Sequence, residues 1–315
     1  MSALPVVALT STIHPDAHAR LAAACDVRVA ADASADALRA IVHEAQGLIV
    51  RNHLPDDIFE NAPRLRAVVR HGVGLDMIPV ERATERGIAV ANLPGSNTTA
   101  VVEYCLGAML HLRRALAGMD AALRAQGWAP ARAMADGGTE LRGATCGIVG
   151  VGTIGSQLAG VAQALGMRTL ALTRRPEALP AGVQAVDKAA LMRDADVIVL
   201  CCPLTPETRG LIDAAALSLA KPTAILINVA RGPVVDAVAL ADALARGALG
   251  GAALDVHDVQ PLPADAAILQ VPRVLLTPHV AGSTATSMRR MSAGAVDDML
   301  RMLSGQPPSH PVNTF

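Results

Sequence analysis

Three polar residues follow three apolar segments in the C-terminal third of the chain. Arg231 lies in INVARGPVVD, Asp255 in GAALDVHDVQP and His279 in LLTPHVAGST. An arginine carries a permanent charge on a planar fork that suits a carboxylate, and a histidine can donate a proton near neutral pH. Reduction of a carbonyl acid needs both an anion clamp and a proton donor. The pattern therefore predicts that Arg231 and His279 are catalytic residues acting on a carbonyl acid, although His279 alone could equally be a structural histidine.

A glycine array earlier in the chain predicts a dinucleotide site. GIVGVGTIG places Gly150, Gly152 and Gly155 in a G-x-G-x-x-G pattern between an apolar strand and a helical pattern. The first glycine permits a tight turn, the second lets the backbone approach a pyrophosphate, and the third allows the helix to pack on the strand. A turn without a ligand is the alternative, but the strand–turn–helix context is the one that the motif requires.

The next apolar segment ends in an unusual way for such a site. An NAD site normally presents an acid there, about 20 residues beyond the glycines, to bind the ribose 2′-hydroxyl. Here LALTRRPEA presents Thr173, Arg174 and Arg175. A hydroxyl followed by guanidinium groups can bind a 2′-phosphate, which a carboxylate would repel. We therefore expect NADP(H) in preference to NAD(H); the alternative is that both arginines are solvated surface residues.

The elements that position these residues alternate along the chain. Five short apolar runs up to GIAVAN are separated by helical patterns at 15–24, 34–45 and 76–86. A long helix is expected at 99–124, followed by a polar arm. Six further strands then alternate with helices, and a last helix is expected at 285–303. Strands joined by helical crossovers form parallel sheets, so the fold class is α/β with a doubly wound nucleotide-binding sheet.

Composition limits the other function classes. A length of 315 residues suits two domains, and a formal charge of −1 provides no general attraction for nucleic acid or an anionic membrane. The five cysteines show no metal-ligand spacing, and no apolar run is long enough to cross a bilayer. We expect a cytoplasmic protein that binds no metal, nucleic acid or membrane.

Seven motifs in order resemble the D-isomer-specific 2-hydroxyacid dehydrogenases: RHGVGLDMI, GIAVANLPGSNTTAVVEYCLGAML, LRGATCGIVGVGTIG, CCPLTPETRGLID, NVARGPVVD, ALDV and LLTPHVAGST. The resemblance spans about residues 47–290. It implies a Rossmann domain at 98–287, inserted into a discontinuous, flavodoxin-like substrate domain at 1–97 and 288–315. It also implies a homodimer joined through the long helix and the arm, and hydride transfer between a nicotinamide and the 2-carbon of a small, anionic 2-oxo or 2-hydroxy acid.

The same resemblance assigns roles to individual residues. Arg231 matches the substrate-orienting arginine and His279 the general acid/base. The substrate-binding positions are Arg51, Asn52, Val73, Gly74 and Asn97. The resemblance also assigns cofactor binding to Thr99 at the domain hinge and to Asp255 and Gly282 near the nicotinamide. Further expected cofactor-binding residues are Thr153, Ile154, Cys202, Pro203, Thr208 and Ala230.

Two departures from the family pattern bear on function. The chain has no acid at Thr173, and in this respect it resembles the NADP-using reductases of glyoxylate and hydroxypyruvate. The third catalytic residue, normally glutamate, is Gln260. Formate dehydrogenases, distant relatives, also carry glutamine there, so formate oxidation is one alternative; Asp258 is a second candidate for the missing carboxylate. A non-enzymatic dinucleotide sensor is a further alternative, although Arg231 and His279 argue against it.

Overall fold

The computed structural model describes residues 4–314, which form two compact units. One unit contains the chain up to Asn97 and from Ser283 onward, and the other is Thr98–Gly282. The expected second boundary, between residues 287 and 288, falls inside helix α11 (Ala285–Leu303). The boundary lies before this helix because α11 packs on α1 (Pro15–Ala22), β3 (Gly47–Val50) and β4 (Ala67–Arg70) of the first unit.

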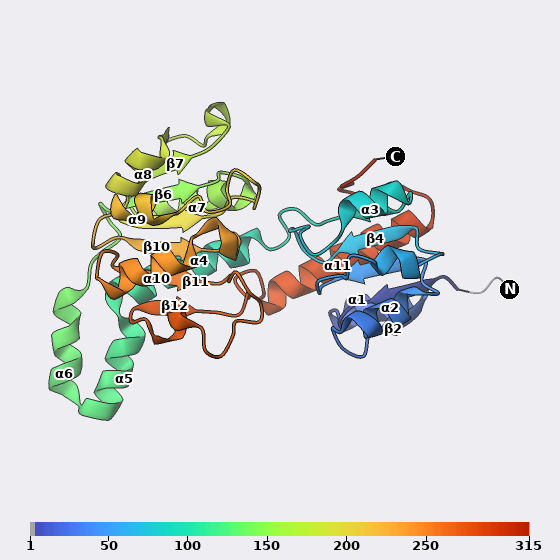
Figure 1. The fold of residues 1–315 in the computed structure, drawn as a ribbon, viewed down its shortest axis with the longest axis horizontal. Coiled ribbons are helices and arrows are strands. Elements are labelled where there is room, and N and C mark those ends of the chain that lie inside the picture. Colours follow the sequence, from blue (N-terminus) through green and yellow to red (C-terminus); the bar gives the residue numbers. More distant parts are fainter. Residues whose placement is uncertain (1–3, 315) are drawn as a thin grey trace. The chain divides into compact units, whose positions relative to one another are not determined.

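The first unit is a five-stranded parallel sheet in the order β2-β1-β3-β4-β5 (Figure 1). This is the flavodoxin-like order. Successive strand residues face opposite sides, so Val7 and Leu9 pack under α1 and α11 whereas Ala8 packs under α2 and η1. Its elements are β1 Val6–Leu9, α1 Pro15–Ala22, β2 Asp26–Val29, α2 Ala35–Val42, β3 Gly47–Val50, η1 Ile58–Asn61, β4 Ala67–Arg70, α3 Val80–Glu85 and β5 Ala89–Ala91.

The chain after α11 returns to the edge of this sheet. Pro311 forms an antiparallel bridge with Ala91, and the Asn313 side chain accepts a hydrogen bond from the Val90 N–H at 2.8 Å. An exposed strand edge presents unpaired backbone groups, so this segment protects β5 and ties the C-terminal part of the chain to the N-terminal sheet.

The second unit is a seven-stranded parallel sheet in the order β12-β11-β10-β9-β6-β7-β8. Numbered from β6, this is the doubly wound order 3-2-1-4-5-6 with one more strand, which confirms the predicted fold class. Helices α4 (Thr98–Arg114) and α7 cover one face, and α8, α9 and α10 cover the other. Its strands are β6 Thr145–Val149, β7 Arg168–Leu172, β8 Val183–Ala185, β9 Val197–Leu200, β10 Ile225–Asn228, β11 Gly251–Leu254 and β12 Val274–Leu276. Its crossover helices are α7 Thr153–Ala164, α8 Lys188–Asp194, α9 Ala214–Ser218 and α10 Ala237–Ala245, with 3-10 turns η3 Pro176–Ala178, η4 Gly232–Val234 and η5 Ala267–Gln270.

Two predictions about this unit were wrong. The six predicted strands omit β8, a three-residue edge strand whose apolar pattern is too short to recognise. The single helix expected at 99–124 is broken, because Ala115 adopts a left-handed conformation (φ 49°) between α4 (Thr98–Arg114) and α5 (Leu116–Gln126). The polar arm continues as α6 (Trp128–Ala133) and η2 (Met134–Gly137), and α5 and α6 form the helical hairpin seen in Figure 1. No helix in residues 4–314 has the length and apolar character of a membrane span.

Candidate active site

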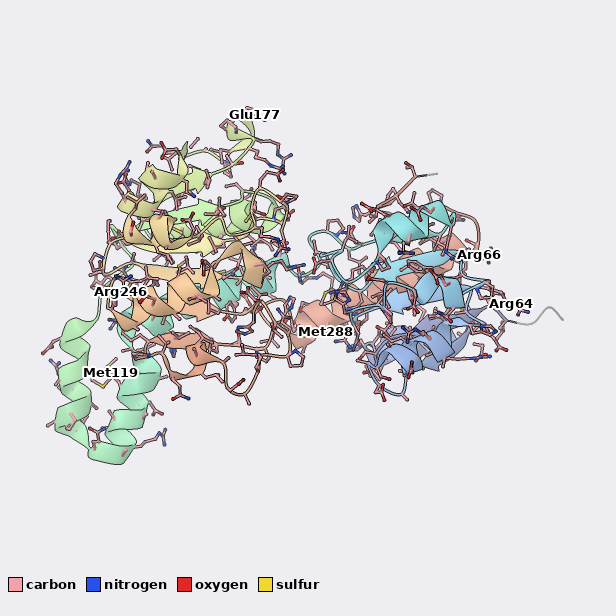
Figure 2. All side chains as sticks on the ribbon, in the orientation of Figure 1. Arg64, Arg66, Met119, Glu177, Arg246 and Met288 are labelled. Atoms are coloured by element: carbon pink, nitrogen blue, oxygen red, sulfur yellow. The ribbon has the colours of Figure 1, made fainter. Side chains whose placement is uncertain are left out.

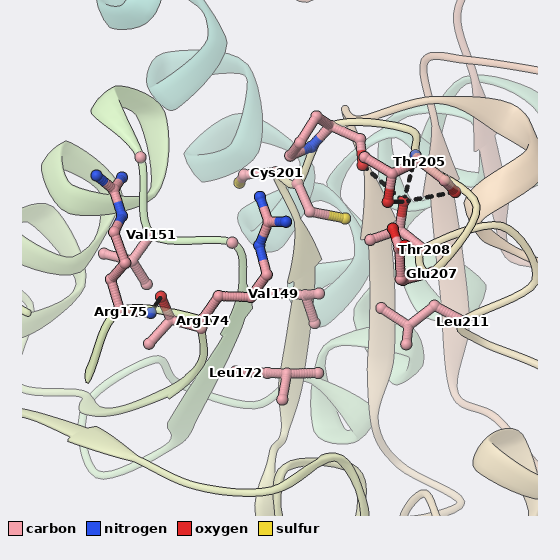
Figure 3. Close-up of a pocket in the computed structure, with 15 residues that line it drawn as sticks. Val149, Val151, Leu172, Arg174, Arg175, Cys201, Thr205, Glu207, Thr208 and Leu211 are labelled. Carbon is pink, nitrogen blue, oxygen red and sulfur yellow. Dashed lines mark hydrogen bonds between the residues drawn. The ribbon is translucent and has the colours of Figure 1, made fainter.

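A pocket of about 400 Å³ lies at the carboxyl ends of β6, β7 and β9 (Figure 3). Strands β6 and β9 are adjacent in the sheet, and the strand order reverses between them. Open α/β sheets bind their ligands at this switch point. The lining includes eight predicted cofactor residues: Gly150, Gly152, Thr173, Arg174, Arg175, Cys202, Pro203 and Thr208.

The glycine array has the geometry that a pyrophosphate site needs. Gly150 has a φ of 89°, and a Cβ there would lie 2.7 Å from the Cys202 Cα. A Cβ on Gly155 would lie 2.3 Å from the Gly150 carbonyl oxygen, so this glycine lets α7 approach the turn. At Gly152, by contrast, a Cβ would meet no atom of the described residues within 4 Å. The backbone is therefore open to a phosphate at the one glycine where the motif requires it.

Two arginines extend from the end of β7 along one side of the pocket (Figure 3). The Thr173 hydroxyl accepts a hydrogen bond from the Arg175 N–H at 3.1 Å and so stabilises the turn that carries them. Across the pocket, the Thr208 hydroxyl donates to the Pro203 carbonyl at 2.7 Å. A hydrogen bond with Thr205 is the main cause of the lowered pKa of Glu207, and the Arg174 charge adds to it. The pocket thus combines an open backbone turn with two arginines and suits a dinucleotide.

His279 contacts Gln260 in the same unit. The Nδ1 of His279 lies 3.0 Å from the Gln260 Oε1, and the Gln260 Nε2 donates to the His257 carbonyl at 3.2 Å. Because that carbonyl can only accept, the amide oxygen must face His279, and Nδ1 must carry a hydrogen. The nitrogen that gains and loses a proton is therefore Nε2. Asp258 does not take this place: its pKa is raised by burial and by the Asp236 charge, and no hydrogen bond between Asp258 and His279 is seen in the described residues.

Asp255 holds the backbone that carries His279. Its buried carboxylate accepts hydrogen bonds from the Val280 N–H at 2.7 Å, the Ala281 N–H at 2.8 Å and the Thr277 hydroxyl at 2.7 Å. Its own carbonyl accepts from the His279 N–H at 2.8 Å. His279 has a φ of 57°, a conformation that few non-glycine residues adopt. These bonds stabilise that conformation and aim the imidazole.

A tyrosine that the sequence patterns did not single out continues this network. The Tyr104 hydroxyl on α4 lies 2.8 Å from the Thr277 hydroxyl, which in turn donates to Asp255. Burial raises the pKa of Tyr104 to about 12, so its hydroxyl remains protonated. Nothing in the local pattern around Tyr104 indicates a partner 173 residues away along the chain.

Arg231 follows β10 on a loop that is held tightly. The buried Asn228 side chain donates to the Arg231 carbonyl at 3.0 Å and accepts from the Ala230 N–H at 3.0 Å. A Cβ on Gly232 would lie 2.2 Å from the His257 carbonyl carbon, so only glycine lets this loop pack against the segment that leads to Gln260. The structure therefore fixes the backbone beneath Arg231, Gln260 and His279 as one packed group of loops.

The first unit presents a backbone site after β4. Arg70 donates to the carbonyls of Val50, His71 and Gly74, and Asn92 donates to the Val73 carbonyl at 2.7 Å. Within the described chain, the N–H groups of Val73 and Gly74 have no hydrogen-bond acceptor. Successive free N–H groups form a concavity that suits an anion. This geometry supports the predicted carboxylate-binding role of the loop.

Several predicted cofactor residues lie outside the pocket lining. Ile154 and Thr153 begin α7, Ala230 lies beside Asn228, and Thr99 accepts a bond from Gln157 at 3.5 Å. Gly282 ends the second unit. The predicted substrate residues Arg51, Asn52, Val73, Gly74 and Asn97 all belong to the first unit.

Comparison with known proteins agrees with this geometry. The family model of the D-isomer specific 2-hydroxyacid dehydrogenase NAD binding domain matches residues 106–281. The chain is 42% identical over 264 residues to the (S)-sulfolactate dehydrogenase of Chromohalobacter salexigens, covering 82% of this chain and 84% of that protein. It is 36% identical over 310 residues to the D-3-phosphoglycerate dehydrogenase of Mycobacterium bovis, covering 96% of this chain but 58% of that protein.

A solved structure is also closely similar. The NADPH-dependent glyoxylate/hydroxypyruvate reductase of Sinorhizobium meliloti, in complex with NADP and malonate, superposes with a TM-score of 0.86 at 31% identity, covering 98% of this chain and 96% of that one. The chain spans a little over half the length of the phosphoglycerate dehydrogenases that it matches. Both the sequence and the fold show that the chain belongs to the D-isomer specific 2-hydroxyacid dehydrogenases.

Proposed function

We propose that this protein reduces a small 2-oxo acid to the D-2-hydroxy acid with NADPH, as the glyoxylate/hydroxypyruvate reductases do. The observation that carries the proposal is the His279–Gln260 pair, held by Asp255 in the same unit as the glycine pocket. A sensor that only binds a dinucleotide has no need of an imidazole whose tautomer and backbone are both held in place.

The cofactor is assigned to the pocket at the switch point. The turn at Gly150 and Gly152 and the start of α7 would hold the pyrophosphate, and Arg174 and Arg175 the 2′-phosphate. When bound, NADPH supplies the hydride that is added to the carbonyl carbon. The preference for NADPH rests on the two arginines and on the acid missing at Thr173, with NAD(H) as the alternative.

The protein residues provide the anion sites and the proton. The N–H groups of Val73 and Gly74 bind the substrate carboxylate, and the Arg231 guanidinium orients the carboxylate and carbonyl. His279 donates the proton from Nε2 to the oxygen as negative charge develops there. Gln260 accepts from Nδ1 and keeps the ring in the tautomer that this transfer requires.

A kinetic panel tests this function. Purified protein is assayed with glyoxylate, hydroxypyruvate, pyruvate and formate, with each cofactor in its appropriate redox state. Steady oxidation of NADPH by a 2-oxo acid, with the D-hydroxy acid as product on chiral chromatography, is the expected result. Formate-dependent reduction of NADP⁺ or NAD⁺ without 2-oxo acid reduction would instead favour the formate alternative, and tight cofactor binding without turnover would favour the sensor.

A second candidate substrate class is a 2-oxo acid with a sulfonate, because the sulfolactate dehydrogenase is 42% identical over most of both chains. Adding sulfopyruvate to the panel tests it. A tenfold higher kcat/KM than with pyruvate is the result expected for this class.

The assembly proposed for the enzyme is a homodimer in the cytoplasm. The hairpin of α5 and α6 exposes Leu116, Leu123 and Trp128, with Trp128 75% exposed, and Met134 at the start of η2 is also exposed. Apolar side chains gathered on a projecting hairpin are typical of an interface. Light scattering should give twice the chain mass, and Trp128→Lys should shift it towards the monomer. The five unpaired cysteines are compatible with a reducing compartment.

A further inference from the structure

His257 lies where three loops of the candidate active site meet. It follows β11, two residues after Asp255, and its side chain is half-buried. The imidazole Nε2 lies 3.1 Å from the Thr277 carbonyl oxygen, 20 residues further along the chain. Because a carbonyl can only accept, Nε2 carries a hydrogen and donates it. Both the neutral ring in this tautomer and the protonated ring have that hydrogen, so the bond forms in either charge state.

The Thr277 carbonyl supports the turn that presents His279. It also accepts a hydrogen bond from the His279 N–H at 3.1 Å, and the same N–H donates to the Asp255 carbonyl at 2.8 Å. His279 has a φ of 57°, a left-handed conformation that costs free energy in a residue with a side chain. The His257 ring therefore anchors the carbonyl around which this turn closes.

The main chain of His257 contacts the two other loops. Its carbonyl oxygen accepts from the Gln260 Nε2 at 3.2 Å, and this bond turns the Gln260 oxygen towards His279. The same carbonyl packs against Gly232, the residue after Arg231, where a Cβ would clash with the His257 carbonyl carbon. One residue thus joins the loops that carry Arg231, Gln260 and His279.

The neighbouring acid does not explain the position of the His257 ring. Asp258 follows it directly and is exposed. The His257 charge is the smallest influence given on the pKa of Asp258, after burial, the Asp236 charge and the Arg209 charge. The bond to Thr277 is therefore the contact that holds the ring.

We propose that His257 is a positioning residue for the reductase reaction, and that its ring bond to Thr277 fixes the aim of the His279 imidazole at the substrate oxygen. This inference rests on the proposed 2-oxo acid reductase function and adds a residue to it. His257 acts through the main chain of Thr277 and not on the reacting atoms. A misaligned general acid transfers its proton more slowly, but its misalignment does not weaken the contacts that bind substrate and cofactor.

The test replaces the ring with and without its donor. His257→Phe keeps a planar ring but has no N–H, whereas His257→Gln places an amide N–H near the position of Nε2 and carries no charge. The single-turnover rate of NADPH oxidation, with the 2-oxo acid that gives the highest kcat/KM, separates the chemical step from product release. In His257→Phe this rate should fall about tenfold, while KM and the NADPH dissociation constant stay near their wild-type values. His257→Gln should recover most of the rate.

His18→Phe is the matched control. His18 is also a half-buried histidine, but it lies on α1 of the first unit, which packs on α11, the helix labelled at Met288 in Figure 2. Its replacement should leave the single-turnover rate at the wild-type value. Thermal unfolding of each variant shows whether the fold is retained.

Three results would overturn the inference and leave the reductase function standing. A wild-type single-turnover rate in His257→Phe would show that the ring bond does not aim His279. An equal loss of rate in His257→Phe and His257→Gln would show that the donor is not the property that matters. A loss accompanied by equally weaker NADPH binding would make His257 a structural residue only. Failure of the wild-type protein to reduce any 2-oxo acid would reject the proposed function and this inference with it.

Discussion

The Nδ1 of His279 lies 3.0 Å from the side-chain oxygen of Gln260, so the residue that supports the imidazole is a neutral amide. An amide fixes the tautomer as a carboxylate does, but it adds no negative charge to favour the imidazolium. Reduction needs the protonated imidazole. The pH range of the reaction should therefore depend directly on this one residue.

Gln260→Glu should move the decline of reductase kcat/KM to higher pH, by about one unit, because the new carboxylate favours the charged imidazole. The measurement is the pH profile of kcat/KM in both proteins. The same reasoning places the wild-type decline at lower pH than in glutamate-containing relatives. His279→Ala should abolish most reduction in either background. A profile that does not move would show that another group sets the charge of His279.

Arg174→Asp combined with Arg175→Ala should weaken NADPH binding at least tenfold, about 1.4 kcal/mol, while sparing NADH. The new carboxylate repels the 2′-phosphate, and the two guanidinium groups that face the pocket are lost. Binding is measured by fluorescence titration with each cofactor. Arg246→Ala is a suitable control, because Arg246 pairs with Asp242 at the end of α10. Equal affinity of the wild type for both cofactors would mean that the arginines are only solvated.

Arg231→Lys should raise KM and lower kcat/KM at least tenfold, about 1.4 kcal/mol of transition-state stabilisation. Lysine keeps the charge but lacks the planar fork that binds a carboxylate and a carbonyl together. Asn228 and Gly232 fix the backbone on either side, so the loop is not expected to adjust to the shorter reach. Near-normal steady-state kinetics would remove Arg231 from the site.

His71 should make stability depend on pH in the acid range. Its pKa falls from 6.5 to about 4 in the folded protein, chiefly through burial. The unfolded chain therefore binds a proton first, and the contribution of neutral His71 is complete above pH 6.5 and is lost as the pH falls towards 4. At pH 5 the loss is roughly 2 kcal/mol.

The measurement for His71 is the urea midpoint at pH 7 and pH 5. His71→Gln retains a polar group for Ser292 but does not titrate, so its midpoint should change less between the two values. An identical pH dependence in the wild type and the variant would contradict the prediction.

The sequence alone determined the parts of this protein that rest on local patterns. Short apolar runs at regular spacing identified all five strands of the first unit and six of the seven in the second. The helix Ala285–Leu303 has the predicted bounds. The glycine array and the arginines after Thr173 could be assigned to one site, because the carboxyl ends of parallel strands meet at one edge of a sheet.

Tertiary structure decided what depends on residues far apart in the chain. The break at Ala115 carries no glycine or proline signal, and β8 exists as a strand only because β7 pairs with it. Sequence could not distinguish Gln260 from Asp258 as the partner of His279, nor show that Tyr104 and Thr277 continue the support of Asp255. It also could not show that His71 is neutral near pH 7, because only packing removes water from its imidazole.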